Sequence, residues 1–240
     1  MKIIAETHSH TVACSHAYST ITENARAAAQ KGLHFLCVTE HGPAMKDGPH
    51  EWFFKNLPQA VPDELEGISI LRGAEANILD YQGTLDIPDT DLNRLDWVIA
   101  SYHTVCCEPG SKQDHTNGWL SVASNPLVDV IGHCGDARFD FDFDTVIAAF
   151  AQYGKIVEIN AHSFDCRPGS KKRCREVALL CKKYQVPVVC SSDAHFYTQI
   201  GKVQPALDML REIEFPEEMI LNIDVERFQK IAQEKSPKKQ

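Results

Sequence analysis

The chain has 240 residues, of which 43% are hydrophobic and 24% are charged, and its formal net charge is −9 at pH 7. This length suits a single α/β barrel, and this composition is ordinary for a globular protein. Sequence-independent binding to nucleic acid requires a basic footprint, so the acidic balance argues against nucleic acid as a partner. A local cationic cleft stays compatible with these values, because net charge does not describe a cleft.

The amino-terminal segment and the cysteines indicate the compartment. Residues 1–6 lack the apolar core of a signal peptide, and no stretch of the chain is long and apolar enough to span a bilayer. The nine cysteines are odd in number and show no CxxC spacing, so we expect reduced thiols. Cys37 and Cys190 lie in apolar runs and are expected to be buried. These features predict a cytoplasmic protein without a membrane partner.

Seven short apolar runs alternate with longer helical patterns. The runs are rich in β-branched residues and too short for helices, which is typical of buried parallel strands. They cover residues 3–5, 35–38, 68–71, 97–100, 128–131, 156–159 and 186–190. In one compact domain this alternation favours a closed α/β barrel. We expect the barrel to occupy residues 1–233, followed by a frayed polar C-terminal tail over residues 234–240.

Three helices carry recognisable signals. A capping box at Thr20 and Glu23 begins a helix that runs through residues 25–31 and is closed by Gly32. Asp144 is expected to cap a second helix that ends at Gly154. Apolar residues at positions 174, 177, 178 and 181 follow the i, i+3, i+4, i+7 spacing of an amphipathic helix.

Metal-capable side chains follow six of the seven predicted strands. In parallel α/β barrels, active sites are built at the carboxyl ends of the strands, so residues far apart in sequence would meet there. Imidazole and carboxylate groups are preferred ligands of zinc and neighbouring first-row metals. The candidate ligands, seven histidines and two acids, are His8, His10, His16, His41, Glu75, His103, His133, Asp193 and His195.

Nine candidate ligands exceed what one ion needs. A zinc ion uses about four ligands, so nine imply two or three metal ions that share at least one bridging carboxylate. Each element alone is a weak signal, because a lone histidine after a strand is more often a satisfied polar residue. The coincidence of all nine at one predicted face is what indicates a multinuclear catalytic site.

The four other histidines are not expected to bind metal. We expect His34 at a strand start on the opposite face and His115 in a polar loop over residues 111–118. His50 follows the second predicted strand and His162 follows the sixth, so both are candidates to reach a substrate.

Three basic residues lie in loops after the fifth and sixth predicted strands. Arg138, Arg167 and Lys171 are candidates to clamp a phosphate group. The alternative for each is an ordinary solvated loop charge.

These motifs resemble the PHP (polymerase and histidinol phosphatase) superfamily, and most closely its small stand-alone bacterial phosphatases with three zinc ions. The resemblance covers nearly the whole chain, and all nine ligand positions hold a matching residue type. The matching motifs are His8-x-His10, residues 16–19, residues 39–43, residues 71–77, His103, His133, residues 158–160 and residues 192–195.

The resemblance implies a distorted (β/α)7 barrel with about three divalent ions, zinc first and manganese or iron as alternatives. Glu75 would bridge two of the ions. The implied ligand groups are His8, His10, Glu75 and Asp193; Glu75, His103 and His133; and His16, His41 and His195.

Three positions depart from the common pattern of the family. Glu40 stands where many members have Asp, Glu6-Thr7-His8 replaces Asp-Leu-His, and Cys134 follows His133 where Pro is common. We expect these changes to affect ligand orientation and metal preference rather than the existence of the site.

Several cations held by only two carboxylates leave a strongly positive pocket, which suits a phosphate dianion. Metal coordination lowers the pKa of a bound water to about 7. Our hypothesis is hydrolysis of a small phosphate monoester by in-line attack of a metal-bridging hydroxide. The alternatives are amidohydrolase-like or nuclease activity on the same metals, and a regulatory domain that keeps metals without turnover. Homo-oligomerisation is left open by the sequence.

Overall fold

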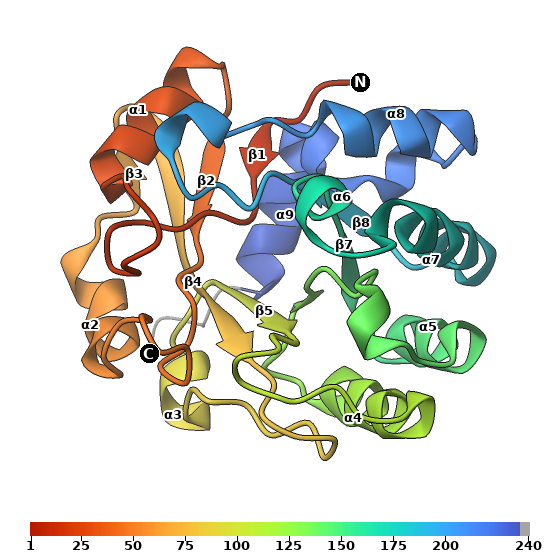
Figure 1. The fold of residues 1–240 in the computed structure, drawn as a ribbon. Helices are drawn as coiled ribbons and strands as arrows, with labels where there is room; N and C mark the ends of the chain where they lie inside the picture. Colours follow the sequence, from red (N-terminus) through yellow and green to blue (C-terminus); the bar gives the residue numbers. More distant parts are fainter. Residues whose placement is uncertain (236–240) are drawn as a thin grey trace.

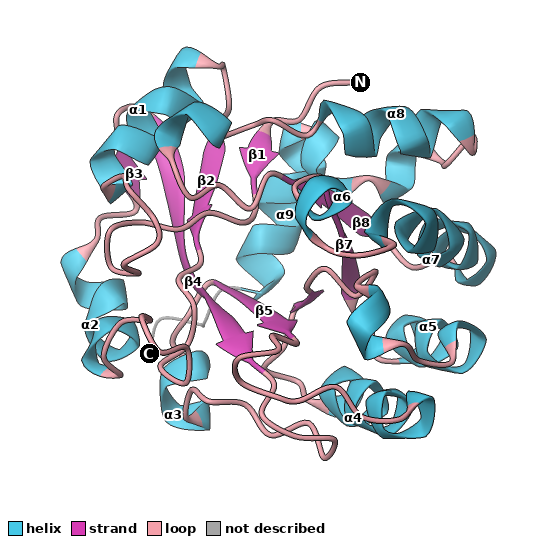
Figure 2. Ribbon diagram, in the orientation of Figure 1, coloured by secondary structure: helices cyan, strands magenta, loops and turns pink. Residues whose placement is uncertain are grey.

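Parallel strands form the centre of the molecule in the computed structural model, which describes residues 1–235. Hydrogen bonding between neighbours gives the strand order β1-β2-β4-β5-β6-β7-β8, and every pairing along this path is parallel. Helices surround the strands, as the cyan and magenta elements of Figure 2 show. The strands are β1 (Ala5–Glu6), β2 (Phe35–Val38), β4 (Ile68–Asn77), β5 (Trp97–Ser101), β6 (Val130–Ile131), β7 (Ile156–Asn160) and β8 (Val188–Ser191).

The helices alternate with these strands, apart from a short hairpin strand, β3 (Glu64–Leu65), that pairs antiparallel with β4. The α-helices are α1 (Ile21–Gln30), α2 (Trp52–Ala60), α3 (Asp89–Leu92), α4 (Lys112–Ser124), α5 (Phe143–Gln152), α6 (Ser163–Cys166), α7 (Ser170–Tyr184), α8 (Gln204–Glu212) and α9 (Val225–Lys235). The 3-10 helices are η1 (Ala137–Phe139), η2 (Tyr197–Gln199), η3 (Glu217–Met219) and η4 (Leu221–Ile223).

The seam between the first and last strands is bridged by residues outside both strands. Beyond the carboxyl ends of β1 and β8, Ser9 and Ala194 form an isolated parallel bridge. Lower in the seam, the buried side chain of Asn222 donates to the carbonyl oxygens of Ala5 at 3.0 Å and Cys190 at 2.7 Å. Its Oδ1 accepts from the Cys190 N–H at 3.0 Å. The barrel is therefore nearly closed, and the predicted distorted (β/α)7 fold is confirmed.

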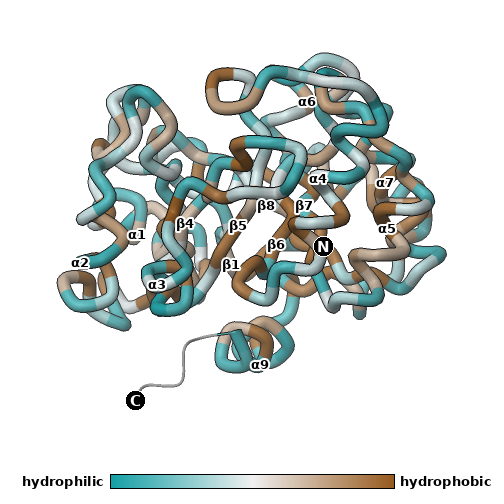
Figure 3. Tube along the Cα trace, turned by 90° about the horizontal axis from the view of Figure 1, so that it is seen from below, coloured by the Kyte–Doolittle hydropathy of each residue, from teal (hydrophilic) through white to brown (hydrophobic). Residues whose placement is uncertain are grey.

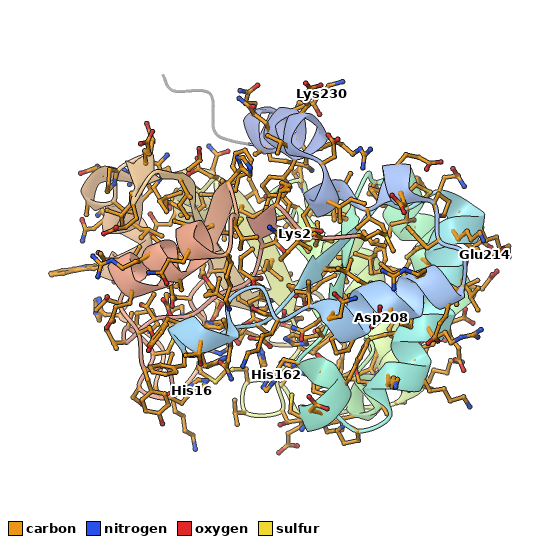
Figure 4. The ribbon with its side chains drawn as sticks, turned by 90° about the horizontal axis from the view of Figure 1, so that it is seen from above. Lys2, His16, His162, Asp208, Glu214 and Lys230 are labelled. Carbon is orange, nitrogen blue, oxygen red and sulfur yellow. The ribbon has the colours of Figure 1, made fainter. Side chains whose placement is uncertain are left out.

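Helix α9 covers the amino-terminal end of the barrel. Its Phe228 is fully buried, with its ring centroid 5.1 Å from that of Phe35 and 5.6 Å from that of Trp97. Figure 3 shows α9 as a separate layer at one end, beneath strands whose tube is largely brown. In Figure 4, Lys230 of α9 and His16 lie at opposite ends of the molecule. The end that α9 leaves open is the one to which the carboxyl ends of the strands point.

Several local predictions are confirmed. At α1, the Thr20 side chain accepts from the Glu23 N–H at 3.2 Å and the Glu23 carboxylate accepts from the Thr20 N–H at 2.8 Å. Gly32 follows α1 with a left-handed φ of 72°, as a closing glycine should. The amphipathic pattern at 174–181 forms part of α7, and Cys37 and Cys190 are fully buried. The nine cysteines, all within the described residues, are free thiols.

The predicted cap of α5 is wrong. Asp142, two residues earlier than predicted, has extended backbone and its Oδ1 accepts from the Thr145 N–H at 2.9 Å. Asp144 lies inside the first turn and pairs with Lys183 at 2.8 Å. Both are acidic residues near the helix start, so the sequence pattern did not separate the cap from the first turn.

The polar loop predicted around His115 is also wrong, because these residues belong to α4. Ser111 caps this helix, and the buried His115 ring donates from Nδ1 to the Asp140 carbonyl at 2.8 Å and accepts from the Gly110 N–H at 2.8 Å. A glycine in mid-helix weakened the helical signal. Gly118 is needed because a Cβ there would lie 1.9 Å from the Tyr102 hydroxyl oxygen.

The predicted boundary at residue 234 falls inside α9, since Glu234 and Lys235 form its last turn. The remainder of the predicted tail, residues 236–240, lies outside the described residues. Across residues 1–235, no helix combines the length and the apolar character needed to cross a membrane.

Replacing Asn222 by Ala removes three hydrogen bonds from buried backbone groups at the barrel seam. We expect the free energy of unfolding of the metal-free protein to fall by about 3 kcal/mol, since each unpaired buried group costs about 1–3 kcal/mol. Urea unfolding followed by circular dichroism measures this change. Asn56→Ala, on the exposed face of α2, is the matched control and should change stability by less than about 0.5 kcal/mol; equal effects of the two substitutions would refute the structural role of Asn222.

Candidate metal centre

The nine predicted ligands lie at or just beyond the carboxyl ends of six strands. Glu75 differs from the sequence expectation, because β4 extends to Asn77 and Glu75 is therefore inside the strand. An isolated bridge to His41 continues the pairing of β2 and β4 at this level. The other predicted ligands occupy the loops that follow β1, β2, β5, β6 and β8.

Glu75 lies at the centre of the group, with its side chain 1% exposed. Both of its carboxylate oxygens face imidazole nitrogens that come from four other strands. Around Oε2 are His41 Nδ1 at 2.7 Å, His8 Nε2 at 3.3 Å and His10 Nε2 at 3.6 Å. Around Oε1 are His133 Nε2 at 2.8 Å and His103 Nε2 at 3.4 Å.

Asp193 faces two of the same imidazoles from the other side. Its Oδ1 lies 3.2 Å from His10 Nε2 and 3.6 Å from His8 Nε2. These two nitrogens are themselves 3.1 Å apart. Four ligand-type atoms from β1, β4 and β8 therefore surround one small volume.

His41, already placed beside Glu75, forms with His16 and His195 a group that extends toward solvent. His16 Nε2 and His195 Nε2 are 3.0 Å apart, and the ring centroids of the three residues are 4.7 to 5.9 Å from one another. His16 is the exposed member, with 44% of its side chain accessible, and Figure 4 places it at the open edge of the molecule.

Hydrogen bonding alone does not account for this arrangement. Four buried atoms at the centre have no hydrogen-bond partner, although each lies close to another polar atom of the group. They are Glu75 Oε2, Asp193 Oδ1, His41 Nδ1 and His103 Nε2. Leaving such atoms unpaired costs about 1–3 kcal/mol each, whereas cations between them would coordinate them all. The residues present thus fit divalent metal ions, which imidazole and carboxylate ligands favour.

Three ring nitrogens on the far side of their imidazoles have protein acceptors. His8 Nδ1 donates to Glu158 Oε1 at 2.6 Å, and His103 Nδ1 donates to Asn77 Oδ1 at 2.8 Å. His16 Nδ1 lies 2.5 Å from an Asp47 carboxylate oxygen. Such partners fix the tautomer and orientation of metal-binding histidines, leaving the opposite lone pair free for the ion.

Glu158 supports the same group of histidines, although its position in the sequence pattern assigned it no role. Besides holding His8, it accepts from the His133 N–H at 2.7 Å and from the Ser191 hydroxyl at 2.5 Å. A charged residue in the middle of the apolar run 156–159 was a signal that could have identified it. Asp47, in the loop after β2, carried no comparable signal.

Two of the predicted ligands have left-handed backbone, His133 with φ of 24° and Asp193 with φ of 49°. Non-glycine residues in this region cost about 1–3 kcal/mol each, and they persist where surrounding contacts over-determine them. At His133 the hydrogen bond from its N–H to Glu158 supplies such a contact.

The charges of the group are mutually dependent. Burial alone would raise the pKa of Glu75, but His8, His103 and His41 bring it well below its ordinary value. Burial raises the pKa of Glu40 to about 7, against hydrogen bonds from Thr11 and Cys14. Glu75 and Asp193, whose pKa values lie well below their ordinary values, are therefore anionic members of the group.

The predicted substrate-binding residues lie in different environments. Arg167, 12% exposed, contacts Asp193 Oδ2 at 3.3 Å and donates to Ser163 Oγ at 2.8 Å. Arg138 forms a bidentate pair with Asp136. Within residues 1–235, neither Arg138 nor the exposed Lys171 and His50 forms a hydrogen bond or ion pair with the nine predicted ligands, so Arg167 is the candidate that the structure brings to the group.

His162 occupies the N-cap position of α6, but its side chain makes no capping hydrogen bond. It is half-buried and lines a cavity of about 650 Å³ together with Ser192 and Lys202. Figure 4 shows His162 on the same open side as His16. His34 is exposed and directly precedes β2, so it lies at a strand start as expected.

Comparisons with known proteins agree with this geometry. The sequence model of the PHP domain matches residues 6–162. A probable phosphatase of Acetivibrio thermocellus is 43% identical over 235 residues, covering 98% of this chain and 97% of the relative. A probable phosphatase of Caldanaerobacter subterraneus subsp. tengcongensis is 43% identical over 237 residues, covering 98% of this chain and 93% of the relative.

Among solved structures, the fold is similar to histidinol phosphate phosphatase from Lactococcus lactis subsp. lactis, determined with zinc, L-histidinol and phosphate. The TM-score is 0.62 at 16% identity, over 90% of this chain and 95% of that chain. Because the domain match covers more than half of the sequence and the curated relatives match along nearly their whole length, the chain belongs to the PHP domain family.

Proposed function

We propose that this protein is a metal-dependent phosphoesterase that hydrolyses a small phosphate monoester at a trinuclear site. The observation that carries the proposal is the Glu75 carboxylate, whose two oxygens are buried among five imidazole nitrogens while Oε2 has no hydrogen-bond partner. A carboxylate in this position is suited to bridge two cations.

The ligands divide into three groups in this proposal. His8, His10, Glu75 and Asp193 would hold one ion, which the distances of 3.1 to 3.6 Å among their facing atoms support. Glu75, His103 and His133 would hold a second ion on the Oε1 side. His16, His41 and His195 would hold the third ion at the exposed edge, with zinc the expected metal and manganese or iron the alternatives.

When bound, the ions would supply Lewis acidity and a hydroxide for in-line attack on phosphorus. The protein's own part is positioning and charge. Glu158 and Asn77 hold His8 and His103 in fixed orientations. Arg167 neutralises Asp193 Oδ2 and has further N–H groups that would donate to a phosphoryl oxygen.

Two further observations support a phosphate ester rather than another substrate. Relatives that are 43% identical over nearly their whole length are named probable phosphatases. The net charge of −9 disfavours a polynucleotide, whose binding needs a basic surface, whereas a small dianion is attracted by the cations alone.

The substitution Glu75→Gln tests the proposal. We expect the purified variant to lose bound metal and its kcat on p-nitrophenyl phosphate to fall at least about 1,000-fold, because a neutral amide bridges two cations poorly. Elemental analysis and a steady-state assay measure the two effects. Glu212→Gln, the same chemical change on the exposed face of α8, is the control; a Glu75→Gln enzyme with wild-type metal content and turnover would rule out the bridging role.

Replacing Arg167 by Met tests the proposed phosphate contact. A charge-assisted hydrogen bond contributes about 1.5–3 kcal/mol, so we expect KM for p-nitrophenyl phosphate to rise about 10- to 100-fold in metal-loaded enzyme. Arg175→Met on the exposed face of α7 should leave KM within about twofold. An unchanged KM in the Arg167 variant would show that this residue is structural only.

A further inference from the structure

Exposed hydrophobic side chains gather around the mouth of the barrel. Eight large hydrophobic residues are exposed within residues 1–235, and six of them lie in the loops or helix starts that follow the strands' carboxyl ends. The six are Val12, Tyr18, Trp52, Val105, Phe196 and Tyr197. Contiguous exposed apolar groups mark interaction or ligand-binding sites in proteins, whereas single exposed residues are ordinary.

Three of these side chains come from two loops that are hydrogen-bonded to each other. We call Tyr18, Phe196 and Tyr197 the aromatic rim; they are 68%, 38% and 41% exposed. The Phe196 and Tyr197 ring centroids are 4.5 Å apart. The Tyr18 N–H donates to the His195 carbonyl at 2.8 Å, and the Tyr197 N–H donates to Ser19 Oγ at 2.8 Å.

The aromatic rim adjoins the exposed end of the candidate metal centre. Tyr18 is two residues after His16, and Phe196 directly follows His195. The side chain of Gln199 accepts from the N–H groups of both His195 and Phe196, at 2.8 and 3.0 Å. Gln199 therefore fixes the backbone of Phe196 relative to that of the predicted ligand His195.

Core packing does not explain these rings, because each exposes more than a third of its surface. Their attachment to the predicted ligands favours an occupant that also reaches the metal centre. A phosphate monoester has two parts, and its alcohol part projects away from the cations that receive the phosphoryl group. Aromatic side chains bind planar rings by stacking or edge contact, each pair adding about 0.5–1.5 kcal/mol beyond the area buried.

We propose that the aromatic rim is a subsite for a planar ring on the alcohol side of the substrate. This inference rests on the proposed phosphoesterase function and narrows its substrate class to small monoesters of ring-bearing alcohols. Tyr18, Phe196 and Tyr197 are its specificity-determining residues.

Benzyl phosphate and ethyl phosphate provide a matched test, since both are monoesters of a primary alcohol and differ in the ring. The quantity measured is the ratio of kcat/KM for benzyl over ethyl phosphate in zinc-loaded enzyme. We expect this ratio to fall about tenfold in the double variant Phe196→Ser/Tyr197→Ser, and to fall in Tyr18→Ser, as the loss of one or two ring contacts predicts. Tyr153→Ser, an exposed aromatic position next to α5, is the control and should keep the wild-type ratio.

Competitive inhibition by benzylphosphonate and ethylphosphonate gives a second readout that does not depend on turnover. The ratio of their inhibition constants should change in parallel with the kcat/KM ratio. Wild-type ratios in both rim variants would overturn the subsite while leaving the phosphoesterase proposal in place. Hydrolysis of neither ester by the zinc-loaded wild-type enzyme would overturn the phosphoesterase proposal, and the subsite with it.

Discussion

The buried carboxylate of Glu75 is the constraint on which the rest of the site depends. A charged carboxylate without compensation is costly inside a protein, yet here its two oxygens face imidazoles from β1, β2, β5 and β6. The imidazoles lower its pKa well below the ordinary value, and its unpaired Oε2 remains available to a cation. Removal of this group would leave the surrounding histidines without a common partner.

The barrel supplies the geometry that this carboxylate needs. Parallel strands deliver side chains from distant parts of the sequence to one end, and Asn222 joins the first and last strands so that His8 and Asp193 face each other. Phe228 of α9 fills the other end. Glu158 then holds His8 and the backbone of His133 from within β7. Stability at one end of the barrel thus supports a left-handed, strained backbone at the other.

The sequence was sufficient to predict the strands and the nine residues at their ends, because buried strands have a strong local pattern and histidines are rare enough to stand out. Features that depend on distant contacts were missed. The sequence does not distinguish Asn222 from other polar residues, because its backbone partners Ala5 and Cys190 are distant along the chain. Gly118 weakened the helical pattern of the segment that contains His115. A glycine stands there because the Tyr102 hydroxyl leaves no room for a Cβ. The aromatic rim is spread over two loops that are far apart in the sequence and are joined by hydrogen bonds from Tyr18 to His195 and from Tyr197 to Ser19.

If Glu75 and its histidine neighbours hold several cations, anomalous X-ray scattering will locate those ions. Crystals of the zinc-loaded protein would be measured above and below the zinc absorption edge. We expect three anomalous peaks at the mouth of the barrel, two of them within coordination distance of the Glu75 carboxylate oxygens, roughly 2.0–2.2 Å. Zinc-loaded crystals with no anomalous peak within that distance of Glu75 would show that its carboxylate does not hold metal ions.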